Sequence, residues 1–123
     1  MTVYVDDMRA NFGNMIMCHM VADTDEELHA MADAIGISRR HWQAPGPLKH
    51  SHYDIALSKK ALALRLGAVP ITQRQAAAMC MHRRRFGLMG NPEGAIAWSR
   101  GPRDAPMDSS LCVPPGETQV DLF

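Results

Sequence analysis

The chain has 123 residues, which is enough for one domain with some length to spare, and 46% of them are hydrophobic. Its formal net charge is zero, and no apolar run approaches the roughly 20 residues that a membrane span requires. No basic segment followed by an apolar one opens the sequence, so we expect a cytoplasmic protein without a secretory signal. An odd number of distant cysteines argues against a disulfide framework or a zinc ribbon, and we expect reduced thiols at Cys18, Cys80 and Cys112.

The zero net charge hides three blocks of opposite sign. Residues 1–38 carry a net charge of −6, residues 39–85 carry +9, and residues 86–123 carry −3. A block as basic as the second suggests a phosphate-bearing partner, such as DNA or a nucleotide. The alternative is that the acidic and basic blocks neutralise each other across the fold.

Two strands are predicted near the N-terminus. Residues 2–5 alternate β-branched and aromatic side chains and are followed by two carboxylates, Asp6 and Asp7. Residues 15–22 form a continuous apolar run, which is typical of a strand buried on both faces. His19 is the only polar side chain in that run, and a histidine in such a place is usually a hydrogen-bonded core residue. The segment between the two strands is expected to form a loop.

Three helices are predicted from the spacing of apolar residues and from capping residues. They are expected between Thr24 and Gly36, over residues 57–66, and between Thr72 and Gly87. Short strands are expected near Trp42 and over residues 68–71. This alternation of strands and helices predicts an α/β fold, with a small, mainly parallel sheet flanked by about three helices.

The composition changes at Leu88. Five of the eight prolines fall after this point, which predicts a flexible tail. Within it, residues 95–98 form the apolar cluster that is the candidate for docking on the domain. The chain is therefore divided into a small α/β domain, a Pro/Gly-rich flexible linker and a C-terminal peptide, which cover residues 1–87, 88–118 and 119–123.

The candidate metal ligands come from two places. Asp6 and Asp7 follow a strand, and open α/β sheets bind ligands beyond the carboxyl ends of their strands. If residues 50–54 are extended, His50, His52 and Asp54 point to the same side, because side chains alternate along a strand. Two imidazoles and a carboxylate would then form half of a site for zinc, manganese or iron. In a solvated loop the same residues would have no such role.

Five basic side chains are the candidates for binding phosphate or nucleic acid: Lys59, Lys60, Arg83, Arg84 and Arg85. The three arginines end the third predicted helix, where the helix dipole also favours cations. A solvated helix end is therefore the alternative interpretation of the arginines.

Residues 1–75 resemble an uncharacterised family of small bacterial and phage domains, the domain of unknown function 4031. The similarity rests on the Val-Tyr-Val-Asp-Asp opening, Ala22-Asp23-Thr24, Glu27-Leu28-His29, Trp42-Gln43, His52-Tyr53-Asp54, Ser58-Lys59 and Leu66-Gly67-Ala68. The family has no established activity. The matched positions, which include His19 and His29, resemble the inventory of a metal-dependent phosphate-ester site using magnesium, manganese or zinc. Its candidate catalytic residues are Asp6, Asp7 and Lys59, and its candidate metal ligands are Asp6, His50, His52 and Asp54.

The final five residues resemble the bacterial sliding-clamp-binding peptide, usually Gln-Leu-(Ser or Asp)-Leu-Phe. Here they are Gln119, Val120, Asp121, Leu122 and Phe123, with Val120 where leucine is commoner. The resemblance implies that the glutamine hydrogen-bonds at the rim of a clamp pocket, which the Leu-Phe pair fills. Burying that pair contributes ~3–6 kcal/mol before ordering costs. A flexible linker of about thirty residues reaches roughly 30 Å, enough to hold a domain beside the clamp.

Three functions are consistent with these features. The first is a DNA-metabolism protein tethered to the sliding clamp, with a domain that is a metal-dependent nuclease or phosphohydrolase. The second is a non-enzymatic adaptor, bacterial or phage-encoded, that binds the clamp or nucleic acid. The third is a nucleotide-binding or nucleotide-hydrolysing domain with an incidental tail.

Overall fold

A computed structural model describes residues 2–47 and 49–107, which form a six-stranded mixed sheet flanked by four α-helices. The sheet order is β4-β5-β3-β1-β6, and β2 pairs with β3 outside this path. In chain order the elements are β1 (Val3–Val5), β2 (Ala10–Phe12), β3 (Met15–Ala22), α1 (Asp25–Ala34), the 3₁₀ helix η1 (Arg39–His41), β4 (Trp42–Gln43), β5 (His52–Ala56), α2 (Leu57–Arg65), β6 (Val69–Pro70), α3 (Gln73–Phe86) and α4 (Pro92–Arg100).

The α/β fold is confirmed, but the sheet is mixed and not mainly parallel. Among the described strands only β1 and β6 pair in parallel, whereas β1 and β3, β2 and β3, β3 and β5, and β4 and β5 pair in antiparallel fashion. The reason lies in the segment after α1, where two strands form instead of one. Since β4 and β5 are antiparallel neighbours, β5 returns beside β3 in the opposite direction.

A second difference from the sequence prediction is the hairpin formed by β2 and β3. The expected loop contains a short strand, and Phe12 pairs with Met15 around a two-residue turn. Gly13 has φ of +59° in this turn, a conformation that glycine adopts at little cost. Phe12 and Met15 are both exposed, so this end of the hairpin projects away from the core.

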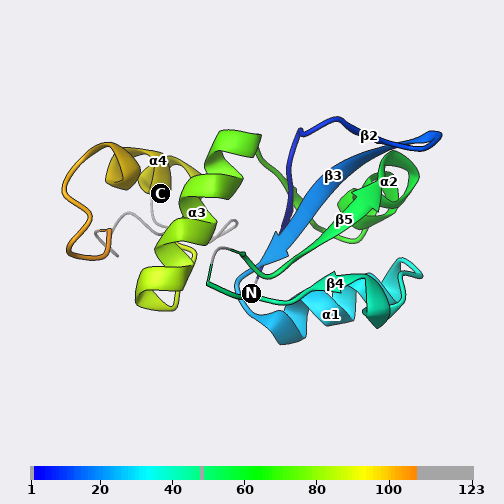
Figure 1. Cartoon of the computed structure of the whole chain (residues 1–123), viewed down its shortest axis with the longest axis horizontal. Coiled ribbons are helices and arrows are strands. Elements are labelled where there is room, and N and C mark those ends of the chain that lie inside the picture. Colours follow the sequence, from blue (N-terminus) through cyan, green and yellow to red (C-terminus); the bar gives the residue numbers. More distant parts are fainter. Residues whose placement is uncertain (1, 48, 108–123) are drawn as a thin grey trace, which may run out of the picture.

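The strands alternate their side chains between two apolar cores. Val3, Val5, Cys18 and Met20 pack with α1 and α2 on one face of the sheet. The residues between them, including Tyr4 and Val21, face α3 and α4 on the other side. Figure 1 shows α3 and α4 together, apart from α1 and α2. The side chain at position 19 therefore points to the α3 face.

The helix termini follow the capping residues predicted from the sequence. Thr24 accepts a hydrogen bond from the backbone N–H of Glu27, and Thr72 and Gln75 form a complete capping box. Gly87 ends α3 in the left-handed conformation. These local interactions depend on residues a few positions apart, which is why the sequence alone predicts them.

Helix α4 lies within residues 88–118, for which a flexible linker is expected. Asn91 caps the helix by accepting a hydrogen bond from the N–H of Gly94, and Pro92 occupies its first position. The apolar cluster docks as the sequence allows, since Ala95 and Trp98 are buried against α3. The packed part of the chain therefore extends to Met107, and residues 108–118 and the terminal peptide lie outside the described residues.

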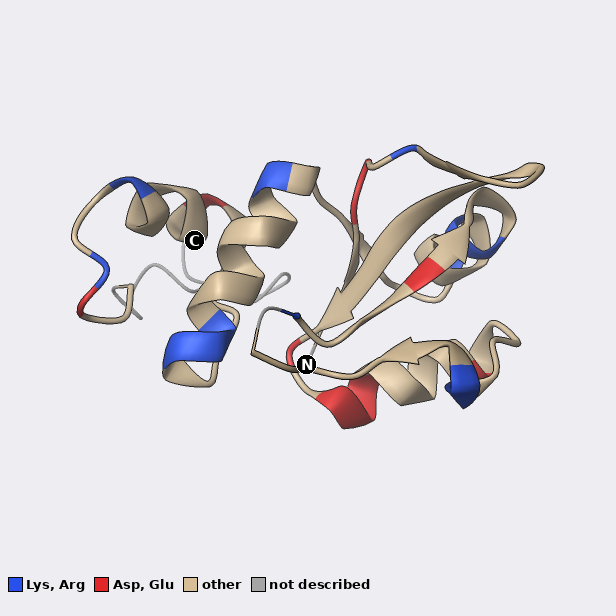
Figure 2. Cartoon of the chain, viewed as in Figure 1, with Lys and Arg blue, Asp and Glu red and all other residues tan. Residues whose placement is uncertain are grey.

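An ion pair between α1 and α3 joins the acidic and basic blocks. Arg83 donates a hydrogen bond of 2.8 Å to the carboxylate of Asp25. Figure 2 shows acidic residues in the first turn of α1 and basic residues at the last turn of α3. Part of the opposite charge is thus neutralised across the fold. Within residues 2–47 and 49–107, no helix has the length and apolar character needed to cross a membrane.

Truncating Trp98 to alanine should detach α4 from α3. The indole is buried, its ring meets the His82 ring edge-on at 4.8 Å, and its N–H donates to the carbonyl of Ala105. We expect Trp98→Ala to lower the free energy of unfolding by about 3–5 kcal/mol, measured by denaturant titration. The exposed neighbour Ala97 provides the control, since Ala97→Ser should change stability by less than about 0.5 kcal/mol. Equal stability of the two variants would contradict the packing of α4.

Candidate metal centre

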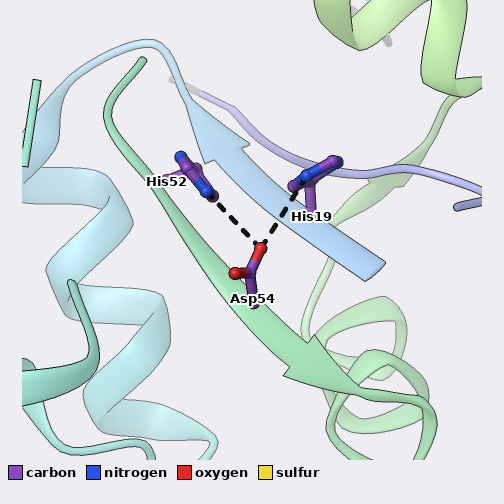
Figure 3. Close-up of side chains that lie close together, drawn as sticks. All are labelled: His19, His52 and Asp54. Atoms are coloured by element: carbon purple, nitrogen blue, oxygen red, sulfur yellow. Dashed lines mark ion pairs between the residues drawn. The ribbon is translucent and has the colours of Figure 1, made fainter. Parts of the chain in front are cut away.

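Three side chains converge on the α3 face of the sheet. His19 on β3 is the cross-strand partner of Asp54 on β5, and His52 lies two residues before Asp54 on the same strand. Because side chains two apart on a strand share a face, β5 places His52 and Asp54 together. The register between the strands then adds His19 (Figure 3). One ligand atom from each residue lies within 4.8 Å of the others, so the group is close enough to bind a metal ion.

Both imidazoles direct their Nε2 atoms toward the carboxylate. His19 Nε2 lies 3.8 Å from Asp54 Oδ1, and His52 Nε2 lies 3.4 Å from the same oxygen. The two rings meet edge-on, with centroids 5.2 Å apart. All three side chains are partly accessible to solvent, so water can complete a coordination shell.

Each histidine is held in place through its other ring nitrogen. His19 Nδ1 is 2.7 Å from Asp6 Oδ2, and the backbone N–H of His19 donates to Asp6 Oδ1 at 2.8 Å. His52 Nδ1 is 2.7 Å from the backbone carbonyl oxygen of His50, which can only accept. When both Nδ1 atoms carry the proton, both Nε2 atoms present lone pairs to the site. A carboxylate or carbonyl behind each imidazole is the usual arrangement of metal-binding histidines.

The electrostatics of Asp6 and His19 reflect this contact. Burial raises the pKa of Asp6, but its hydrogen bonds from His19 outweigh burial and hold the pKa below its usual range. The same hydrogen bond raises the pKa of His19, against an opposing effect of burial. Asp6 is therefore a buried anion whose charge is directed at the ring of His19.

The carboxylates predicted as catalytic residues lie behind and beside this group. Asp6 is placed behind His19, and both of its carboxylate oxygens accept hydrogen bonds, so it does not face the cluster directly. Asp7 is exposed and accepts a hydrogen bond from the backbone N–H of Gln73 at the start of α3. This contact gives Asp7 a helix-capping role.

The two lysines contact backbone carbonyls. Lys59 donates to the carbonyl oxygen of Ile35 at the end of α1, on the other face of the sheet. Lys60 donates to the backbone carbonyl of Asp6 at 2.8 Å. Both ammonium groups thus donate to backbone carbonyls.

Two of the three arginines line a cavity next to the cluster. Arg83 and Arg84 border it with His50, whereas Arg85 lies over the ring of Phe86 and does not line it. Burial lowers the pKa of His50, and the nearby charge of Arg84 lowers it further. His50, predicted as a metal ligand, is thus placed between the cluster and the arginines.

His19 is the member of the three-residue group that the strand pattern assigns to the core, although the family resemblance includes it among the candidate site residues. Its place in an apolar strand predicts a buried side chain. Its position opposite Asp54 follows only from the pairing of β3 with β5 in the observed register. The available signal was its alternation with the apolar residues of β3, which places it on the opposite face from Cys18 and Met20.

A model of the family described as Protein of unknown function (DUF4031) matches residues 3–83. The chain belongs to this family. The DUF4031 match includes every member of the His19, His52 and Asp54 group, and it ends within α3. No curated protein and no solved structure matched the chain.

Removing the charge of Asp6 should weaken metal binding without removing a ligand. Asp6→Asn loses the carboxylate that orients His19, and losing such a partner typically costs about 10–100-fold in metal affinity. Asp7→Asn is the matched control, because the adjacent carboxylate contacts only α3 among the hydrogen bonds described here. Isothermal titration with Zn²⁺ measures both variants. Equal affinities would contradict the orienting role of Asp6.

Proposed function

We propose that this DUF4031 domain is a metal-dependent hydrolase of phosphate esters that acts on nucleotides or DNA. The observation that carries the proposal is the pair of imidazoles whose Nε2 atoms are both turned toward Asp54. Asp6 and the carbonyl of His50 fix this orientation before any ion binds. A group held this way has little conformational freedom to lose on binding.

The donor set favours some metals over others. Two imidazole nitrogens and one carboxylate suit Zn²⁺, Mn²⁺ or Fe²⁺ better than Mg²⁺, which prefers oxygen ligands and retains water. A bound divalent ion at such a site lowers the pKa of a water ligand and stabilises charge on a phosphoryl oxygen. The chain's own part is to present three ligands and leave the remaining positions open to solvent.

The surroundings of the cluster support an anionic substrate. His50 borders both the cavity at His19 and His52 and the cavity at Arg83 and Arg84. Guanidinium groups bind phosphate oxygens with paired donors. The neighbourhood therefore favours phosphate esters over neutral substrates.

A phosphodiesterase and phosphomonoesterase assay of the full chain tests the proposal. The substrates are bis(p-nitrophenyl) phosphate and p-nitrophenyl phosphate, each with EDTA and with added Zn²⁺, Mn²⁺ or Mg²⁺. We expect EDTA to abolish turnover and Zn²⁺ or Mn²⁺ to restore it. Stoichiometric metal binding without turnover of either ester would contradict the hydrolase and favour the non-enzymatic adaptor.

The C-terminal peptide suggests where the domain acts. We propose that residues 119–123 bind a bacterial sliding clamp and so tether the domain to replicating DNA. The support is the sequence itself, in which two large apolar residues end a polar tail that offers them little apolar cover. An isolated domain with an incidental tail would bind nucleotides equally well without the peptide.

A further inference from the structure

Two neighbouring cavities on the α3 face share the lining residues His50 and Cys80 and are together called the groove. The first, of about 190 Å³, is bordered by Arg83, Arg84 and His50. The second, of about 160 Å³, is bordered by the ligands His19 and His52 together with His50 again. Cys80 of α3 also borders both. The groove therefore runs from the metal ligands, past His50, to the arginines at the end of α3.

The two arginines are not equivalent. Arg83 forms an ion pair with Asp25, so much of its charge is already balanced. Arg84 is exposed and donates to the backbone carbonyl of Pro47, and it forms no ion pair with any carboxylate in residues 2–47 and 49–107. Arg84 can therefore leave the neutral carbonyl of Pro47 and bind an anion such as phosphate instead.

His50 supplies a second, independent observation. Its Nδ1 atom is buried and has no hydrogen-bond partner among the described residues. Buried polar atoms are nearly always hydrogen-bonded, so an unpaired one points to a partner that the protein itself does not supply. Because His50 borders both cavities, a ligand in the groove would lie beside its imidazole ring.

We propose that Arg84, with His50 and Arg83, forms a phosphate subsite beside the metal ligands, so that the substrate carries a second phosphate next to the scissile one. The substrate assignment rests on the proposed function, since the scissile phosphate must lie at His19, His52 and Asp54. The subsite itself rests only on the groove and its cations. Two kinds of substrate have this chemistry. One is a nucleotide with two phosphate groups, and the other is a nucleic-acid strand whose neighbouring phosphate occupies the subsite.

The small side chains of α3 are consistent with an extended ligand. Ala76 and Ala77 border the groove at its metal end, where larger residues would narrow it. His50 lies between the two ends, and its ring borders both cavities. A nucleotide has the phosphate groups and the sugar that an extended ligand of this groove would need.

Phosphate binding by the metal-free protein tests the subsite separately from the hydrolase. In EDTA, the affinity for thymidine 5′-monophosphate is measured by calorimetry for the full chain and for Arg84→Ala. We expect Arg84→Ala to lower affinity by about 10-fold or more, because a hydrogen bond to a charged group contributes about 1.5–3 kcal/mol. Arg85→Ala is the matched control on the same helix turn and should retain affinity within about twofold, as expected for an exposed charge outside the groove.

The variant His50→Phe tests the same subsite and leaves both arginines in place. His50→Phe keeps a ring but removes Nδ1, and it leaves the backbone carbonyl that holds His52. We expect weaker phosphate binding with unchanged Zn²⁺ affinity. Equal losses in Arg84→Ala and Arg85→Ala, or no loss in Arg84→Ala and His50→Phe, would overturn the subsite.

A competition arm separates the two sources of phosphate. A 5′-phosphorylated tetrathymidylate should displace the monophosphate if the groove accepts a strand, whereas failure to displace assigns the subsite to free nucleotides. Arg84-dependent binding in EDTA together with an inactive hydrolase assay would remove the proposed function and leave the subsite. Active hydrolysis without Arg84-dependent binding would remove the subsite and leave the proposed function.

Discussion

Asp54→Ala should abolish metal binding and with it any metal-dependent hydrolysis. Asp54 supplies the carboxylate that both imidazoles face, so its loss leaves two histidines without an anionic ligand. His52→Ala should have a similar effect, because it removes one of the three donors. We expect each variant to lose more than the roughly 10–100-fold typical of an outer partner. Calorimetric titration with Zn²⁺ and the phosphodiester assay measure the two losses.

The control for these variants is His41→Ala. His41 is exposed on η1 and lies outside the three-residue group, so it tests for metal binding by surface histidines in general. Circular dichroism should show that all three variants remain folded, since the replaced side chains are partly exposed or fully exposed. Metal binding that persists in Asp54→Ala and His52→Ala would place the ion elsewhere.

Deleting Gln119 to Phe123 should abolish binding to a bacterial sliding clamp. The Leu122 and Phe123 side chains are expected to contribute most of the affinity, through ~3–6 kcal/mol of apolar burial before ordering costs. Surface plasmon resonance on immobilised clamp measures the loss. The single variant Phe123→Ala should retain only a trace of binding, since the aromatic side chain fills the larger part of the pocket.

Thr118→Ala, one residue outside the peptide, provides the matched control and should bind like the unmodified chain. Metal affinity should be the same with and without the peptide, because the three ligands lie in the domain. Clamp binding that survives the deletion would rule out this peptide as the tether. No clamp binding by the intact chain would leave the nucleotide-binding domain with an incidental tail.

Local features of the fold were predictable and long-range pairing was not. Strand β3 was predicted with its observed ends, and the threonine caps and glycine termini of α1 and α3 depend on nearby residues alone. The parallel sheet was inferred from alternation of elements, which contains no information on whether one or two strands follow α1. Helix α4 was missed because the prolines and glycines around it resemble a linker, although Pro92 begins the helix.

The candidate site likewise contains residues that one strand predicts and residues that only the pairing of strands brings together. His52 and Asp54 could be predicted because period-two alternation within one strand places them together. His19 required the register between β3 and β5, and that register is set by the whole sheet. Asp6 was predicted as a ligand from its place after a strand. In the structure the same place brings its carboxylate to the far nitrogen of His19.

Titration of the metal-free chain with Zn²⁺ and Mn²⁺, followed by the NMR signals of the histidine rings, is the most direct measurement of whether His19, His52 and Asp54 bind an ion. Saturable binding of one ion per chain, with the His19 and His52 signals shifting together and that of His41 unchanged, is the result we predict. If neither ion binds up to millimolar concentration, or if the shifts fall on other histidines, the three side chains are only an ion-paired cluster on the sheet.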